Sequence, residues 1–300
     1  MQLPQPNELI SMRDWVRWGA SCFSAAELSF GHGTQSALDD ALALVLHALH
    51  LDHTLPADYL AARVTSAEAE RIVQLFETRV EQRVPVAYLI GEARFAGLDF
   101  FVDENVLIPR SPIAELIEEG FAPWLEPDQV TSVLDLCCGS GCIGIACAYA
   151  FPQALVDVSD ISPAALEVAA RNIERHRLED RVRALRADVY DGLDGERYDL
   201  IVSNPPYIPV ADISGLQPEV AAYEPRIALD VERSSRGLVV EDPVRTKVEN
   251  ALGPCRCAVV LHPPVEVLVG RPRDRHAVVD DGVAGPFHGP AGPRDRAVRD

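Results

Sequence analysis

The chain has 300 residues, of which 48% are hydrophobic, and its formal net charge is −19. This length allows one large domain or two ordinary ones, with enough apolar residues for a sizeable core. Proteins that coat nucleic acid neutralise phosphates with clustered Lys and Arg, so the acidic balance argues against that class and we expect no direct DNA binding. It favours a basic partner, although an acidic surface that serves only solubility explains the charge equally well.

The apolar stretches at 41–51 and 142–151 are much shorter than the roughly 20 residues that a membrane-spanning helix needs. No basic and then apolar signal segment opens the chain. We therefore expect a cytoplasmic protein with no membrane contact. The seven cysteines lack paired Cys-x-x-Cys spacing, so we expect reduced thiols and no metal site.

The first ninety residues are expected to form a small, mainly helical bundle. Apolar residues recur on one helical face in 37–51, namely Leu38, Leu42, Val45, Leu46 and Leu49. Thr65 and Glu68 form a capping-box pattern that opens a second helix, and Pro85 ends it. Between 91 and 109 the apolar residues fall near every second position, which predicts a hairpin.

Strands and helices alternate after residue 112, in the pattern of a doubly wound parallel α/β sheet. The expected strands cover 130–137, 155–159, 182–187 and 198–203, and the expected helices cover 111–121, 141–150 and 163–176. Ligands of such sheets bind at the carboxyl ends of the strands. The residues that follow each strand are therefore the candidate ligand groups.

The first strand contains Asp135 and leads into a turn with Gly139 and Gly141, where backbone can approach a ligand and a helix start offers free N–H groups. A dinucleotide would suit this turn as well. Asp160 and Asp188 follow the next two strands, where carboxylates can accept from ribose hydroxyls and from an adenine amino group. Asp135 would then face the cationic methionine part of S-adenosylmethionine. Taken singly, each of these acids could equally be solvated or cap a helix.

The tetrapeptide Asn204-Pro205-Pro206-Tyr207 follows the fourth strand. The side-chain carbonyl of Asn204 and the backbone carbonyl of Pro205 can both accept from one planar NH2 group, and the prolines hold the backbone rigid. Tyr207 would pack on that flat group. An amide nitrogen is a poor nucleophile, so positioning would supply most of the catalysis and no strong general base is required. The pattern predicts methylation of an amide or aromatic amine nitrogen.

These motifs resemble those of the N(5)-glutamine methyltransferases over about residues 15–230. Further matching pieces lie at 30–34, 83–89 and 106–113. Release-factor enzymes of this family carry a Pro-Glu-Thr-Glu type segment after a Pro-Arg pair, whereas this chain has Pro109-Arg110-Ser111-Pro112-Ile113, which resembles the subgroup that modifies large-subunit ribosomal protein L-three. Cys137 and Cys142 also suit that subgroup.

The resemblance implies a class I S-adenosylmethionine-dependent methyltransferase domain of the Rossmann-like α/β type at 113–230. It also implies a helical substrate-recognition domain at 1–90 and a β-hairpin linker at 91–112. The implied methyl donor is S-adenosylmethionine, and the implied substrate is the basic ribosomal protein L-three. The candidate catalytic residues are Asn204, Pro205, Pro206 and Tyr207, and the candidate cofactor-binding residues are Asp135, Cys137, Gly139, Ser140, Gly141, Asp160 and Asp188.

Three alternatives stay open. A release-factor glutamine methyltransferase is the nearest. A DNA adenine amino-methyltransferase would share the Asn-Pro-Pro-Tyr tetrapeptide, because adenine offers the same planar NH2. The third is an inactive remnant whose helical domain binds the ribosomal protein without catalysis.

The resemblance ends near residue 230. Residues 231–300 contain eight Pro, ten Arg and a single aromatic residue, and 271–275 and 286–300 have the composition of unstructured coil. We hypothesise that this tail is out-of-frame translation and lacks the last strands of the sheet. The alternative is a divergent but folded end with strands at 258–261 and 265–269. Resequencing the coding DNA tests the hypothesis, which fails if neither alternative frame after codon 230 encodes the missing strands.

Overall fold

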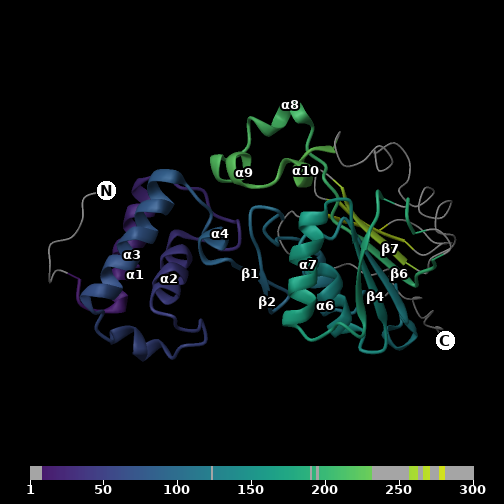
Figure 1. The fold of residues 1–300 in the computed structure, drawn as a ribbon, viewed down its shortest axis with the longest axis horizontal. Coiled ribbons are helices and arrows are strands. Elements are labelled where there is room, and N and C mark those ends of the chain that lie inside the picture. The colour runs from purple at the N-terminus through teal and green to yellow at the C-terminus, as the bar shows by residue number, and fades with distance from the viewer. Residues whose placement is uncertain are drawn as a thin grey trace, which may run out of the picture.

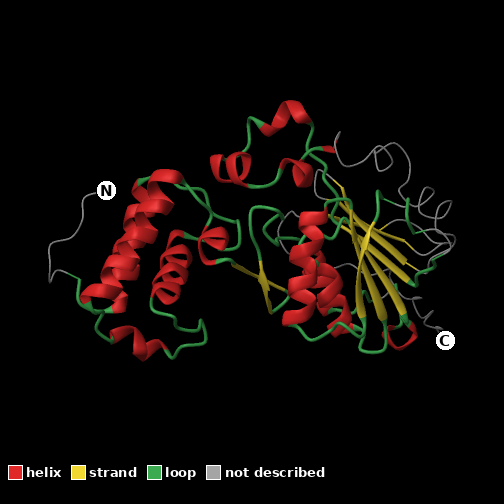
Figure 2. Cartoon of the chain, in the orientation of Figure 1, coloured by secondary structure: helices red, strands yellow, loops and turns green. Residues whose placement is uncertain are grey.

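The computed structural model describes residues 9–122, 124–189, 191–193 and 196–231, together with the backbone of three strands at 257–262, 266–270 and 277–280. A helical N-terminal region lies on one side, an α/β region on the other, and a short hairpin between them (Figure 1). Figure 2 shows helices and loops, and no sheet, in the described residues of the first region. Within the described residues, no helix is both long enough and apolar enough to cross a membrane.

The N-terminal region is the predicted helical bundle. It contains α1 (Met12–Ala25), α2 (Ala37–Ala48), η1 (Ala57–Ala61), α3 (Ser66–Glu77), η2 (Thr78–Gln82) and α4 (Val86–Ile90). The capping box predicted at Thr65 and Glu68 is present, and Ser11 forms a second one with Asp14. A core of its own surrounds Phe23 and Phe76. Leu38 is an exception to the predicted apolar face, because it lies in the first turn of α2 and is 55% exposed.

The predicted hairpin is present between the two regions. Its strands β1 (Glu92–Phe95) and β2 (Leu98–Phe101) are antiparallel, and Ala96 and Gly97 make the turn with positive φ. The buried side chain of Asn172 accepts from the N–H of Phe101 (2.7 Å) and donates to its carbonyl (3.0 Å). This pair of bonds fixes the hairpin to the α/β region.

The α/β region is built on one seven-stranded sheet in the order β5-β4-β3-β6-β7-β8-β9. The predicted strands are confirmed as β3 (Ser132–Leu136), β4 (Leu155–Asp160), β5 (Val182–Arg186) and β6 (Leu200–Ser203), all parallel. The predicted helices are confirmed as α5 (Ile113–Glu118), α6 (Cys142–Ala150) and α7 (Pro163–Arg175), and η3 (Pro127–Gln129) precedes β3. Helices α6 and α7 pack on one face of the sheet (Figure 1).

The C-terminal strands are present, which corrects the expectation that the tail lacks them. β7 (Cys257–His262) pairs with β6 in parallel, and β8 (Glu266–Gly270) and β9 (Ala277–Asp280) follow as antiparallel neighbours. These bounds agree with the alternative of a divergent but folded end. The edge of β6 is therefore paired with a neighbouring strand. The predicted coil at 271–275 and 286–300 lies outside the described residues, and the out-of-frame origin of the tail stays a hypothesis.

A segment of three short helices follows the fourth parallel strand. These are α8 (Val210–Ile213), α9 (Pro218–Tyr223) and α10 (Arg226–Leu229). The segment extends from the end of the sheet toward the helical region and then returns to the sheet (Figure 1). We call residues 208–231 the return segment.

Candidate active site

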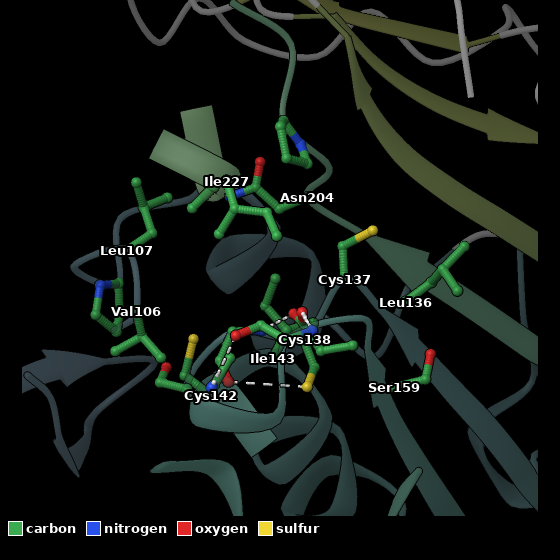
Figure 3. Close-up of a pocket in the computed structure, with 18 of the residues that line it drawn as sticks. Val106, Leu107, Leu136, Cys137, Cys138, Cys142, Ile143, Ser159, Asn204 and Ile227 are labelled. Atoms are coloured by element: carbon green, nitrogen blue, oxygen red, sulfur yellow. Dashed lines mark hydrogen bonds between the residues drawn. The ribbon is translucent and has the colours of Figure 1, made fainter. Parts of the chain in front are cut away.

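A cavity with about 870 Å³ of space, part of it open to solvent, lies at the carboxyl ends of the parallel strands. Residues of the hairpin linker, of the turn after β3, of the ends of β4 and β5, of the tetrapeptide and of α10 line it. Figure 3 shows Asn204 and Ile227 together on one side of the cavity and Cys138, Cys142 and Ile143 on the other. The position agrees with the rule for ligands of open α/β sheets.

The turn after β3 brings backbone to the cavity wall. Positive φ angles occur at Cys137 (61°), Gly139 (53°) and Gly141 (75°), before α6 begins. This conformation is uncommon for a residue other than glycine, so Cys137 holds a position that Gly would usually occupy. Cys137, Gly139 and Ser140 line the cavity, whereas Gly141 lies behind them as the N-cap of α6.

Gly144 allows α6 to approach the sheet closely, a role that the sequence analysis missed. A Cβ atom at this position would lie 2.4 Å from Cγ1 of Val158, too short for a real contact, and 3.0 Å from Cβ of Asp135, which is a very tight one. The close approach lets the N–H of Gly144 donate to Oδ2 of Asp135 at 2.8 Å. A glycine one turn into a predicted helix was the available signal.

Asp135 does not take the expected position facing a ligand. Its side chain is fully buried against the start of α6, where it accepts from the N–H of Gly144, and it is not part of the cavity lining. Its Oδ1 atom has no hydrogen-bond partner. Burial raises the pKa of this carboxyl to about 7, an effect that the N–H of Gly144 opposes and the nearby Asp160 increases. Asp135 therefore supports the turn from below.

Asp160 connects the turn to the next crossover at the end of β4. Its Oδ2 accepts from the N–H of Gly139 (3.0 Å) and its Oδ1 from the N–H of Ser162 (2.9 Å), the residue whose hydroxyl caps α7. Burial raises the pKa of its carboxyl, and the backbone donors offset part of that rise. Asp160 lines the cavity as predicted.

Asp188 follows β5 but its side chain is exposed. Its backbone exchanges hydrogen bonds with Asp191 at 3.1 and 3.0 Å. The residues on either side of it, Ala187 and Val189, line the cavity. Asp188 therefore lies next to the cavity without forming its wall.

The tetrapeptide directly follows β6, and the hydroxyl of Ser203 donates to the carbonyl of Leu136 at 2.7 Å, which ties it to β3. Asn204 and Pro206 line the cavity. Pro205 is buried, and Tyr207 is 40% exposed. The structure thus brings Asn204 to the same cavity as Asp160 and the turn after β3.

The hairpin linker supplies a wall that the sequence analysis did not assign. Arg110 lines the cavity and forms a bidentate ion pair with Glu224. Its Nη2 donates to Oε2 at 2.6 Å, and its Nη1 donates to Oε1. The Glu224 side chain is 1% exposed and the Arg110 side chain 30%, so the carboxylate end of this pair is shielded from water. Arg110 lies in one of the segments that suggested the resemblance, but 114 positions separate it from Glu224, so the pairing could not be read from the sequence.

Among the described residues, the cavity lining has one acidic and one basic side chain, Asp160 and Arg110, and the basic one is neutralised by Glu224. Across the part of the chain that the structure describes, no group of three or more His, Cys, Asp or Glu side chains is arranged to hold a metal ion. The site therefore offers a carboxylate, backbone N–H groups and an amide.

This arrangement, a parallel sheet with a Gly turn after its first strand and candidate ligand groups at the strand ends, is that of a Rossmann-like α/β domain. The Methyltransferase small domain family matches residues 120–214, a range that contains the Gly turn, Asp160 and the tetrapeptide. Among solved structures, a human methyltransferase 10 domain containing protein covers 55% of this chain and 70% of its own with 16% identity and a TM-score of 0.38.

Three named relatives show to which family within the methyltransferases the chain belongs. The ribosomal protein uL3 glutamine methyltransferase of Xylella fastidiosa is 50% identical over 78% of this chain and 75% of its own length. The protein of the same name from Xanthomonas campestris is 49% identical over 78% and 76%, and that from Francisella tularensis 46% identical over 75% and 71%. The chain belongs to the ribosomal protein uL3 glutamine methyltransferase family, which confirms the resemblance and its subgroup.

Proposed function

We propose that this chain transfers a methyl group from S-adenosylmethionine to the side-chain amide nitrogen of a glutamine in ribosomal protein uL3, the large-subunit protein L-three. The observation that carries the proposal is the position of Asn204 on the wall of the cavity that Asp160 and Gly139 also line. The names of the relatives support the choice of substrate.

The residues of the cavity fit a cationic cofactor better than a pyrophosphate. A pyrophosphate could use the backbone N–H groups of the turn after β3, but the Asp160 carboxylate beside that turn would repel it, and Arg110, the one basic side chain of the described lining, already pairs with Glu224. Two carboxylates without a basic partner among the described residues, Asp135 and Asp160, lie at or under the wall. When bound, S-adenosylmethionine supplies an electrophilic methyl group on a cationic sulfur.

Asp160, Gly139, Ser140 and Cys137 are the residues that would hold this cofactor at the wall. Asp188 lies where it could reach the rim of the site, and Asp135 and Gly141 would act from behind the turn. The carboxylate of Asp160 suits two adjacent ribose hydroxyls, because it has acceptor capacity beyond the two backbone bonds that it already makes.

The tetrapeptide would hold the substrate amide. Asn204 and Pro205 offer two carbonyl acceptors, so both N–H bonds of a glutamine amide can be fixed and the nitrogen is kept in one orientation. Fixing a weak nucleophile in place lowers the entropic part of the barrier. The described lining contains no His or Lys that could act as a general base, which agrees with loss of the proton after methyl transfer. Exposed Tyr207 would cover the bound amide.

We assign recognition of the ribosomal protein to the helical region of residues 1–90, the link to the hairpin of 91–112 and catalysis to 113–230. The net charge of −19 supports a basic protein substrate. A ribosomal substrate also implies a cytoplasmic location.

Radiolabelled S-adenosylmethionine tests the proposal when the full chain is incubated separately with ribosomal protein L-three, a release factor and duplex DNA. We expect label in L-three alone, with mass spectrometry placing one methyl group on a glutamine side chain. Label only in the release factor, or only in DNA, would replace the proposed substrate by that one. Binding of L-three without transfer to any substrate would indicate an inactive remnant.

A further inference from the structure

The return segment starts and ends beside the tetrapeptide. The N–H of Ile208, the residue after Tyr207, donates to the carbonyl of Leu229 at 2.9 Å, and the N–H of Val231 donates to the carbonyl of Ile208 at 3.1 Å. Two residues of α10, Ile227 and Ala228, line the cavity. A displacement of this segment would therefore move the cavity wall and the end of the tetrapeptide together.

The other end of the return segment is held by the helical region through Glu219 of α9. This side chain is 0% exposed, and its Oε1 accepts from the backbone N–H of Ser29 (3.0 Å) and from Nη1 of Arg83 (2.9 Å). Nη1 of Arg79 lies 3.6 Å from the same oxygen. Three groups of the helical region thus converge on one carboxylate of the α/β region.

The two arginines are themselves fixed inside the helical region. Arg79 is 2% exposed, and it donates from Nε to Asp40 (2.8 Å) and from Nη2 to the carbonyl of Ser29 (2.9 Å). Arg83 donates from Nη2 to the carbonyl of Ala26 at 3.0 Å. These bonds fix the orientation of both guanidinium groups. Glu219 can therefore contact both arginines only when α9 lies in one position relative to the helical region.

Two weaker contacts lie on either side of this ion pair. Nε2 of His32 and Oε1 of Gln217 are 2.6 Å apart, and the hydroxyl of Tyr223 donates to the carbonyl of Gln82. Both again join the helical region to α9, whose position next to that region is visible in Figure 1.

We propose that Glu219 is a positioning residue, which fixes the return segment, and through it Asn204 and the wall at Ile227, against the helical region. A buried ion pair adds little stability over an apolar contact of the same size, but it defines one geometry. The helical region would thus complete the active site as well as bind the substrate. This role rests on the proposed function only where turnover is concerned.

Hydrogen–deuterium exchange of the full chain without substrate tests the link independently of activity. In Glu219→Gln we expect the amides of Ile208 and Val231 to exchange at least about tenfold faster than in the unsubstituted chain, because a broken buried ion pair loosens the segment that it holds. The amides of β3 should keep their protection. Glu118→Gln, an exposed glutamate on α5, is the matched control. Unchanged exchange at Ile208 and Val231 would overturn the proposal.

Arg83→Gln provides a second variant that is easier to tolerate, because its side chain is 32% exposed. It should accelerate exchange of the same two amides, and combining it with Glu219→Gln should add little to the effect of Glu219→Gln alone, since that substitution already weakens the contact with Arg83. The control is Arg13→Gln, which is exposed on α1. Additive effects of the two substitutions, or loss of protection throughout the chain in both, would assign Glu219 a merely structural role.

Steady-state kinetics then distinguishes a positioning role of Glu219 from a general loss of active-site structure. With L-three as substrate, Glu219→Gln should lower kcat by about tenfold and leave the KM for S-adenosylmethionine unchanged, because the cofactor wall belongs to other strands. An equal loss in cofactor KM, or an unchanged kcat, would contradict the positioning role. If the unsubstituted chain does not methylate L-three, the proposed function fails, whereas the exchange result still decides the link.

Discussion

Buried carboxylates in two regions of this protein differ in whether arginines neutralise them. At the cavity, Asp135 and Asp160 are buried or nearly so, and among the described residues neither pairs with a basic side chain, so burial raises the pKa of both carboxyls. In the return segment, Glu219 and Glu224 are also buried, but arginines contact each of them. Burial would raise the pKa of Glu219 too, yet Ser29, Arg83 and Arg79 outweigh it and lower that pKa.

The difference indicates what each region does. A carboxylate left without a cation in a buried place is costly, and it becomes favourable only when a positive ligand arrives. A carboxylate that arginines already neutralise can take no such ligand and instead fixes two segments against each other. We infer that the cavity can bind a cation and that the ion pairs of the return segment fix its conformation.

The largest expected effect comes from removing the charge of a carboxylate that pairs with an arginine. Glu224→Gln removes the charge from the buried end of the ion pair with Arg110, and we expect the free energy of unfolding to fall by about 3 kcal/mol, the lower end for a buried pair because the Arg110 side chain is 30% exposed. Urea unfolding followed by circular dichroism measures it. Glu92→Gln is the matched control, since Glu92 pairs with Arg175 at 3.1 Å while both side chains are about 40% exposed, and it should cost less than about 1 kcal/mol. Equal losses in the two variants would refute the distinction.

The next effect concerns Asp135, a buried carboxylate with no basic partner among the described residues, and it depends on pH. The folded-state pKa of Asp135 is about 7, above its ordinary value of 3.8, so the native chain holds this proton more tightly than the unfolded chain. The resulting stability is complete below about pH 4 and is lost as the pH rises through 7. Asp135→Asn cannot lose a proton, so its stability relative to the unsubstituted chain should improve by about 2–3 kcal/mol between about pH 5 and pH 8.

Urea unfolding at a series of pH values measures this difference, with the exposed Asp128→Asn as control. The control should follow the unsubstituted chain at every pH. If Asp135→Asn followed it as well, Asp135 would be ionised throughout and the proposed cost of its burial would be wrong.

A smaller effect compares two carboxylates at the same edge of the sheet. Asp160→Asn should weaken binding of S-adenosylhomocysteine by about tenfold, because the new NH2 group faces a backbone donor and one acceptor is lost. Asp188→Asn should weaken it by less than about threefold, since this side chain is exposed and its amide still forms hydrogen bonds. Isothermal titration calorimetry measures both. A greater loss for Asp188→Asn would reverse the assigned roles.

The sequence predicted the parts of the site whose signal is local. The Gly turn, the four parallel strands, the hairpin and the tetrapeptide are all contiguous patterns, and each lies where it was expected. Asp135 was placed in the cavity because a carboxylate near the end of a strand suggested a ligand. On a strand that is buried on both faces, the side-chain pattern does not show which face a residue takes.

The parts that could not be predicted depend on distant pairs. Arg83 and Glu219 are 136 positions apart, and neither stands in a pattern that specifies its partner. The composition of residues 231–300 suggested a missing end to the sheet, whereas β7 continues it beside β6, because a short apolar run is enough to pair with a strand that is already in place.

The most direct test of the account is the effect of Asn204→Ala on methyl transfer to L-three. We expect kcat to fall by about 10²–10³-fold, as when one fixed polar group of a reaction site is removed, while the affinity for S-adenosylhomocysteine is unchanged. Transfer at the unsubstituted rate, with the same glutamine methylated, would show that Asn204 does not hold the amide.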